Sequence, residues 1–184
     1  MVARMRDRPD IQRLVGDLIR PGLVASVDLA ADPPACTVAV GDLVTGPLPF
    51  LALRAGRVRI WSPPSVGEQC LLLCAEGDSN AGFVLPALYC DAFPPPAASA
   101  DVVSVAFADG STLSYDMAAH HLAVALSGGS ASLAAPGGLT IEGDVTVTGK
   151  IAASQDVTAA GISLKSHPHD KVQPGSGQSA GPLA

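Results

Sequence analysis

Apolar and polar residues alternate with a repeat of six between Gly137 and Asp170. Strand side chains alternate between two faces, so the apolar third and fifth positions of each hexad share one face. The residues there are Leu139, Ile141, Val145, Val147, Ile151, Ala153, Val157 and Ala159. The pattern predicts a narrow β rod with one apolar stripe. It changes parity at Ile162 and Leu164, which predicts a bulge or turn at Ala160-Gly161.

A single chain cannot bury this stripe. Ordering six residues costs about 6 to 12 kcal/mol of backbone entropy, whereas burying two aliphatic side chains returns only about 3 to 6 kcal/mol. Five hexads are too few for a self-sufficient solenoid, so several chains are expected to wind together. Three is the smallest number that closes a prism around an apolar axis and leaves no strand edge exposed. We therefore predict an intertwined, triple-stranded β-helix over residues 101–165.

The first 21 residues show helical periodicity instead. From Asp7 to Arg20, apolar residues recur at helical offsets, with Pro9 in the first turn and Pro21-Gly22 as the expected stop. They are Ile11, Leu14, Val15, Leu18 and Ile19. Two interpretations remain open: a helix packed on its own domain, or a docking arm for a partner or sister chain.

Short strands separated by turn signals follow over residues 22–91. The expected strands are Leu23 to Leu29, Ala35 to Val40, Leu48 to Leu53, Arg57 to Trp61, Gln69 to Cys74 and Gly82 to Tyr89. This many strands in under seventy residues predict a small closed barrel of the OB type. Trp61, the only tryptophan, is interpreted as a core or rim anchor because the usual aromatic platform for ligands is absent.

A stiff, proline- and alanine-rich connector is expected at residues 92–100. Beyond it, Val102 to Ala108 and Ser111 to Tyr115 flank Asp109-Gly110, which is a strong hairpin signal. Two further strands are expected at Leu122 to Leu126 and Ala131 to Ala134. The fold class is therefore all-β, with an N-terminal helix, an OB barrel and the C-terminal triple-stranded β-helix.

Composition narrows the classes of function. Net charge is −6 and aromatic residues make up only 4% of the chain, so nucleic-acid binding lacks both its electrostatic and its stacking component. The N-terminus leads into no apolar signal region, and the longest aliphatic run, at Leu71 to Leu73, is far too short to span a membrane. We expect a chain made in a cytoplasm and kept there unless another machine exports it.

Two groups of reactive residues do not form a recognisable site. The four cysteines show no C-x-x-C pair and lie in apolar segments, so buried free thiols are favoured over a four-thiolate zinc site; they are Cys36, Cys70, Cys74 and Cys90. His120 and His121 have only Asp116 nearby and no nucleophile in a recognisable turn, so a solvated or packed pair is favoured over catalysis.

The pair His167-Pro168-His169 is the candidate metal site. Pro168 favours an extended backbone, which lets both imidazoles project to the same side. Two ligands from one chain make a weak site, but at a threefold axis they become 2 × 3 = 6 nitrogens, enough for octahedral coordination. The alternative is a mobile histidine-rich tail with incidental metal affinity. Iron, nickel, copper and zinc all accept imidazole, so the residues alone do not name the ion. We assign residues 166–184 to a metal-binding apex and tail.

Two separate segments resemble a known family. The motif Trp61-Ser-Pro-Pro-Ser-Val-Gly-Glu-Gln69, with Gly77-Asp78 and Gly82-Phe-Val-Leu-Pro-Ala-Leu-Tyr89 after it, is similar to the baseplate assembly protein V family. The end of the chain, Gly161-Ile-Ser-Leu-Lys-Ser-His-Pro-His-Asp170 with its glycine- and serine-rich tail, resembles the tip of the same proteins. Asp170 and Lys171 depart from the family pattern by placing charges beside the histidines, which leaves the ion preference at the tip less certain.

The resemblance implies a homotrimeric, non-enzymatic spike at the centre of a contractile phage tail, located in the virion and assembled in the bacterial host cytoplasm. The helix and the OB barrel would mount it on tail hub and baseplate proteins, and the rod would pierce the host outer membrane. One iron ion per trimer, held by His167 and His169 of each chain, would fasten the tip, although another divalent transition metal would also fit. A small tip protein is a further partner that the resemblance allows.

Two other functions stay open on the sequence. Hexad repeats beside a histidine suggest a left-handed β-helix acyltransferase, although those enzymes carry one aliphatic residue per hexad and need many coils. An OB module that binds carbohydrate or a protein partner on a stalk is the other, although exposed aromatic residues would be expected for it.

Overall fold

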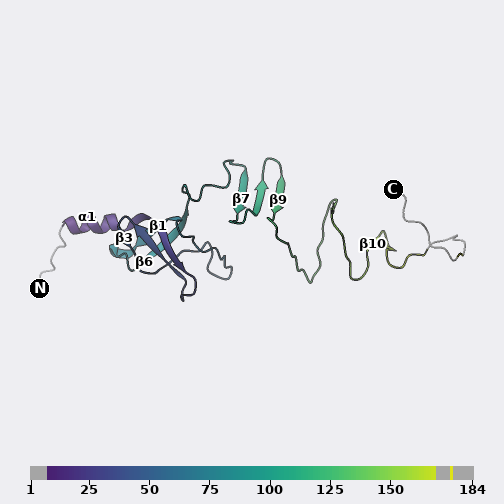
Figure 1. The fold of residues 1–184 in the computed structure, drawn as a ribbon, viewed down its shortest axis with the longest axis horizontal. Coiled ribbons are helices and arrows are strands. Elements are labelled where there is room, and N and C mark those ends of the chain that lie inside the picture. The colour runs from purple at the N-terminus through teal and green to yellow at the C-terminus, as the bar shows by residue number, and fades with distance from the viewer. Residues whose placement is uncertain (1–7, 169–174, 176–184) are drawn as a thin grey trace. The chain divides into compact units, whose positions relative to one another are not determined.

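The computed structural model describes residues 8–168 and Gly175. The chain divides into two units, Met1–Ala131 and Ser132–Ala184. The first unit holds helix α1 (Arg8–Asp17), a six-stranded sheet and a separate three-stranded sheet. The second holds one short hairpin (Figure 1). Most of the regular structure is β, as the sequence predicts.

Helix α1 ends at Asp17, three residues before the expected end. Leu14 lies against the short 3₁₀ helix η1 (Ala75–Gly77), where a Cβ added at Gly77 would come within 3.0 Å of the Leu14 side chain. Ile11 and Val15 are exposed. The helix therefore packs on its own unit through one side and leaves apolar side chains uncovered, so both interpretations of this helix keep support.

The six-stranded sheet is centred on β1 (Ile19–Asp28), which pairs antiparallel with β2 (Ala35–Val40) and β5 (Gln69–Cys74). Strand β6 (Gly82–Leu88) extends the sheet beyond β5. Strands β3 (Leu43–Val44) and β4 (Leu48–Pro49) pair with β2. Just after β4, Phe50 bridges Val84 of β6, and Leu51 N donates to the Val84 carbonyl at 2.8 Å. This contact closes the sheet on itself and confirms the predicted barrel.

Small and branched side chains fill the barrel. Its buried residues are Val24, Cys36, Val38, Val40, Leu48, Cys70, Leu72, Cys74 and Val84. Three of the four cysteines belong to this core, as predicted, while Cys90 is half-buried. Burial raises the pKa of the Cys70 thiol to about 11, so Cys70 packs as a neutral apolar group.

The expected strand starting at Leu23 begins earlier, because Ile19 to Gly22 pair with β5. Gly22, expected to end a helix, lies in a strand where the neighbouring strand crosses closely. A Cβ at this position would fall 2.5 Å from Val38 Cγ1 and 2.8 Å from the Ala39 carbonyl oxygen. Only glycine allows β1 and β2 to approach so closely.

Gly22→Ala is therefore expected to lower the free energy of unfolding of the barrel by about 1 to 3 kcal/mol, because the added methyl overpacks a tight core. Urea unfolding followed by the fluorescence of the single tryptophan, Trp61, measures this effect. Gly16→Ala in α1 is the matched control, since nothing lies within 4 Å of its added methyl. An equal loss in both variants would contradict the steric explanation.

The three-stranded sheet comprises β7 (Val102–Ala106), β8 (Thr112–Asp116) and β9 (His121–Ala125), each antiparallel to its neighbour. The predicted turn at Asp109-Gly110 is confirmed, with Gly110 at φ 86°. The Asp109 carboxylate accepts from the Ser111 amide at 2.8 Å and from its hydroxyl at 3.1 Å. These two bonds hold the pKa of Asp109 below its ordinary value.

Two expected strands are absent from the single described copy, and others are shorter than expected, such as β7, which ends at Ala106 and not at Ala108. Residues 57–61 and 131–134 form no strand, and β4 covers only Leu48–Pro49 of the segment expected to reach Leu53. In place of the strand at 57–61, Ala55 and Arg59 form a single bridge within a loop. The barrel closes through Phe50 instead, which bridges Val84 of β6.

Candidate functional site

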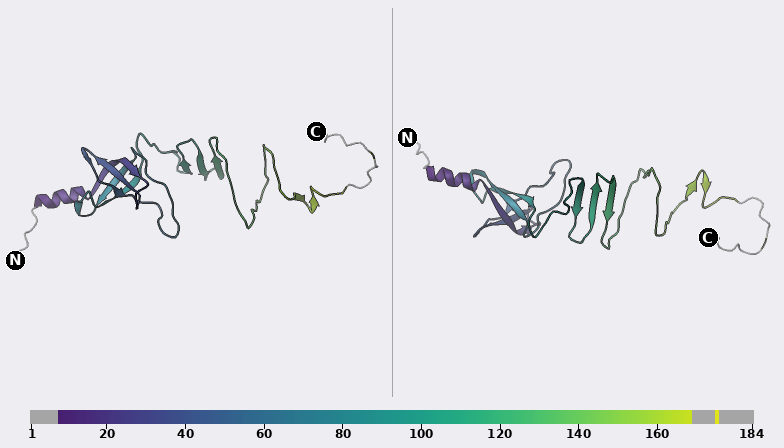
Figure 2. Two further views of the ribbon diagram at one scale, coloured as in Figure 1. Left: turned by 60° about the horizontal axis from the view of Figure 1, so that its bottom comes forward. Right: turned by 90° about the horizontal axis from the view of Figure 1, so that it is seen from above.

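Strands β7, β8 and β9 lie side by side in one sheet (Figure 2), and their registers place the large apolar side chains of all three strands on one face. The strand registers align Val103 with Tyr115 and Leu122, and Val105 with Leu113 and Val124. These six side chains are 41% to 63% exposed. The opposite face carries small and polar residues, including Ser104, Ser114 and Ala123 in one row. We call the six residues the apolar sheet face.

This face was missed at the sequence level, although its signal is visible there. Each of the three expected strands alternates large apolar residues with small or polar ones, and the large residues fall in register only once the two hairpins are formed. A two-sided, three-stranded sheet with one such face requires a cover.

The hexad region also exposes large apolar side chains in one copy. Between β9 and β10 (Thr158–Ala159), the described residues form no regular strand. The large apolar residues of the stripe are 46% to 74% exposed; they are Leu139, Ile141, Val145, Val147, Ile151 and Val157. The backbone of one copy therefore finds no ladder within itself, and the triple-stranded β-helix stays a prediction.

The C-terminal hairpin pairs β10 with β11 (Ile162–Ser163). Ala160 and Gly161 both have positive φ, 49° and 84°, which confirms the turn predicted at this point. A further bond from Leu164 N to the Val157 carbonyl, 2.8 Å long, extends the hairpin by one rung. The hairpin is the one piece of regular structure among the described residues of the second unit.

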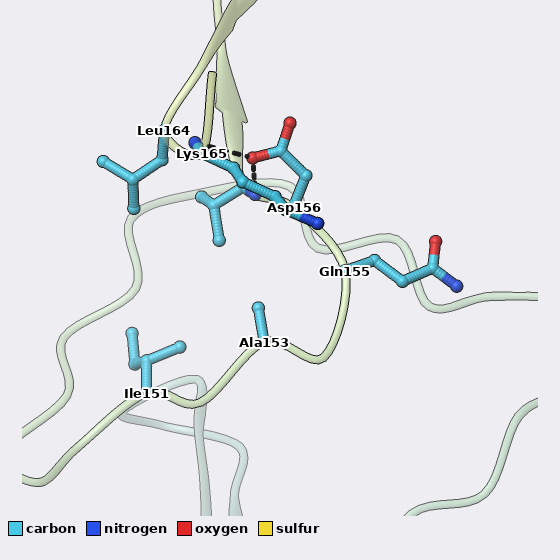
Figure 3. A pocket seen from close by; sticks show the side chains of 7 residues that line it. Ile151, Ala153, Gln155, Asp156, Leu164 and Lys165 are labelled. Atoms are coloured by element: carbon cyan, nitrogen blue, oxygen red, sulfur yellow. Dashed lines mark hydrogen bonds between the residues drawn. The ribbon is translucent and has the colours of Figure 1, made fainter. Parts of the chain in front are cut away.

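Asp156 holds the base of this hairpin (Figure 3). Its Oδ1 atom accepts from the amides of Val157 at 2.9 Å and Lys165 at 3.1 Å, so one carboxylate ties the incoming and outgoing chains. Hydrogen bonds, first from Ser163 and then from backbone amides, hold the pKa of Asp156 below its ordinary 3.8. Beside Asp156 lies a hollow of about 380 Å³ that Ile151, Ala153 and Leu164 line with apolar atoms.

Acid is expected to loosen this hairpin. Because the native pKa of Asp156 is lowered, its contribution to stability is fully present above pH 3.8, the ordinary value, and is lost as pH falls through the lower native value. Asp156→Asn removes the charge at any pH, so we expect several-fold faster hydrogen exchange of the Val157 and Lys165 amides by NMR. Asp144→Asn, a change at an exposed carboxylate of the same unit, should leave these amides unaffected. Equal exchange rates in the two variants would show that Asp156 does not hold the hairpin.

His167 follows the hairpin directly and is exposed. Its Nδ1 atom lies 2.8 Å from the carbonyl oxygen of Ser163. A carbonyl oxygen only accepts, so Nδ1 is the donor in this contact. Metal-binding histidines in proteins are commonly oriented by such a bond to the second nitrogen. The contact thus holds the His167 ring against the end of the hairpin.

The second candidate ligand, His169, lies outside the described residues, as does the tail beyond it apart from Gly175. Within the described part of one chain, no three side chains of histidine, cysteine, aspartate or glutamate converge on a metal position.

The remaining candidates are placed away from this tip in the sequence. His120, with φ 51°, and His121 lie at the β8–β9 turn, where Asp116 Oδ1 accepts from the amides of Ala118 and Ala119. Trp61 is exposed at the barrel rim and contacts Phe50 with ring centroids 6.3 Å apart. No helix among the described residues is long and apolar enough to cross a bilayer.

Comparison with known proteins agrees with this architecture. Residues 20–89 match the family model described as the type VI secretion system/phage-baseplate injector OB domain. A stretch of 107 residues, 58% of the chain, is 39% identical to the spike protein of Escherichia phage P2 and covers 50% of that protein. The chain thus spans about half the length of this curated relative. By these two matches the chain is similar to phage baseplate spike proteins, and its closed barrel lies in the segment that matches the injector OB domain.

Proposed function

We propose that this protein is the homotrimeric spike of a contractile phage tail or phage-like particle. The apolar sheet face carries the proposal. Six large side chains in register, all exposed in one copy, need a cover of the same chemistry. Three copies of a face around one axis supply that cover and close the arrangement.

The hexad region supports the same assembly. Its apolar stripe is exposed in one copy, and its backbone forms no ladder within the described chain. Strands from neighbouring copies would pair these backbone groups and bury the stripe. Both the backbone hydrogen bonds and the apolar burial would then stabilise the assembly. The resulting triple-stranded β-helix resists bending because every strand edge is paired.

The metal site belongs to the proposal as its closing element. His167 and His169 of three copies would supply six imidazole nitrogens to one transition-metal ion, with iron as the first candidate. Coordination would tie the narrow end of the rod, where the least apolar surface is available, by linking folding to metal binding. The bond from His167 to Ser163 supports this role because it orients the ring that would bind.

The similarity to phage baseplate spike proteins supports a location in the virion tail, at the baseplate. We propose that the barrel and α1, through the exposed Ile11 and Val15, mount the spike on tail hub proteins. The rod would be driven through the host outer membrane when the tail contracts, with a small tip protein as a further partner. Assembly would take place in the cytoplasm of the host bacterium. The work is mechanical, and no covalent chemistry is required.

Sedimentation of the full chain, with metal analysis of the same sample, tests this function. A particle of three chains with one metal ion supports the spike. A folded monomer without metal would contradict it, and acyl transfer from a thioester donor would favour the enzyme interpretation instead.

A further inference from the structure

The loop between β4 and β5 forms a small projecting hairpin at residues 54–60. Ile60 N donates to the Arg54 carbonyl at 3.0 Å, and Gly56 N donates to the Val58 carbonyl at 3.1 Å. Ala55 and Arg59 face each other across a bridge. At its base, the ring of Trp61 lies against that of Phe50. These bonds give the loop a defined backbone although it lies outside the sheet. We call it the basic hairpin.

Apart from Arg20 at the start of β1, which lies 3.7 Å from Asp17, all basic residues of the barrel lie on this hairpin. Between residues 21 and 91, the only basic residues are Arg54, Arg57 and Arg59. Seven acidic residues lie outside the hairpin in the same segment: Asp28, Asp32, Asp42, Glu68, Glu76, Asp78 and Asp91. The formal charge of residues 21–91 is therefore 3 − 7 = −4. The segment is thus separated into a basic projection and an acidic remainder.

The described part of the same copy offers no counter-charge to the hairpin. Among the described residues, no carboxylate forms an ion pair with the three arginines. Leu53 is 82% exposed and Trp61 is 63% exposed. Arginine and tryptophan next to apolar side chains are the residue types that dominate the energetics of protein interfaces. The hairpin therefore has the composition of a binding element.

Some of the acidic residues already accept hydrogen bonds within their own chain. Glu68 accepts from the amides of Ser65 and Ala87, and Asp28 accepts from those of Ala30 and Ala31. By contrast, Asp32 and Asp42 are exposed, and no hydrogen bond or ion pair with another described residue involves them. They lie in the β1–β2 and β2–β3 turns of the barrel. The negative carboxylates on these turns are therefore available to pair with the positive hairpin.

We infer that the basic hairpin of one copy docks on the acidic barrel turns of the next copy, with Asp32 and Asp42 as its first counter-charges. This rests on the proposed trimer. A hairpin and a separate acidic surface make a heterologous contact, which closes into a ring when the rotation is threefold. Copies joined by the rod would meet at high effective concentration, so even a modest contact would form. The chain itself carries the opposite charge, which favours a second copy over an unrelated partner.

Trp61 reports on this contact directly because the chain has no other tryptophan. The full-length chain is first confirmed as a trimer by sedimentation, and Trp61 is then titrated with acrylamide, an uncharged quencher. Docking should at least halve the quenching constant relative to the same trimer carrying Arg54→Glu, Arg57→Glu and Arg59→Glu. Raising the salt concentration should increase quenching in the unaltered trimer. The Arg54→Lys, Arg57→Lys, Arg59→Lys variant keeps the charges and should keep most of the protection.

Reversing the charges on both sides of the proposed contact gives the decisive experiment. Asp32→Arg with Asp42→Arg should expose Trp61 in trimers of otherwise unaltered chain and restore its protection in trimers whose hairpin carries the three glutamates. A trimer whose Trp61 is freely quenched at low salt would overturn the inference while leaving the trimer intact. Protection that appears only when vesicles of anionic lipid are added would also overturn it, since the occupant would then be a membrane. A monomer in sedimentation would instead contradict the proposed function.

Discussion

Leu113→Asp is expected to leave the chain monomeric at micromolar concentration. Leu113 lies on the central strand of the three-stranded sheet and opposes Val105 and Val124 across the apolar sheet face. In a trimer, three leucines would be lost from the interface, at about 1.5 to 3 kcal/mol each. Each buried and unpaired carboxylate would cost several kcal/mol more. The sum, above 10 kcal/mol per trimer, exceeds what the remaining contacts of one layer can offset.

The neighbouring residue gives a matched control. Ser114 lies on the same strand and points to the opposite face, in a row with Ser104 and Ala123. Ser114→Asp adds the same charge at almost the same place in the chain and should sediment as a trimer. Dissociation of both variants would indicate general damage to the sheet. A trimeric Leu113→Asp protein would show that the apolar sheet face does not lie in the interface.

The sequence predicts the barrel well where each strand is bounded by local turns. Strands β2 and β5 have the expected bounds, because alternation and flanking turns agree there. The start of β1 is harder to predict, because Ile19 and Pro21-Gly22 fit the end of a helix as well as the start of a strand. The proline and glycine are tolerated since Pro21 lies in the half of β1 that pairs only with β5, and Gly22 meets the crossing of β2 closely.

The rod and its tip show where prediction from one chain ends. The turn at Ala160-Gly161 could be predicted because parity changes and a glycine coincide. The bond from His167 to Ser163 could not, since it depends on the path of the chain after the hairpin. The proposed pairing of the hexads would depend on neighbouring copies, which a single sequence does not describe. The apolar sheet face lies between these cases, because its six residues align only after two hairpin registers are known.

Replacing both tip histidines, as His167→Ala with His169→Ala, is expected to abolish bound metal and to loosen the end of the rod. Coordination energy counts as folding energy where a site forms only in the assembled state, so its loss should cost several kcal/mol per trimer. Metal analysis should fall from one ion per three chains to none, and hydrogen exchange should increase in the hairpin of residues 158–163. His120→Ala with His121→Ala removes the other two histidines and should retain the metal.

The monomeric Leu113→Asp protein separates a shared site from an incidental one, because its two tip histidines are intact. A site made by three copies must disappear with the trimer, although its own ligands are unchanged. A histidine-rich tail with intrinsic affinity would instead hold metal in the monomer, at a ratio set by the single chain. Since the contact between His167 and Ser163 lies within one copy, the monomer should keep the same orientation of the ring. Any loss of metal in the monomer would then follow from missing neighbours and not from a misplaced ligand.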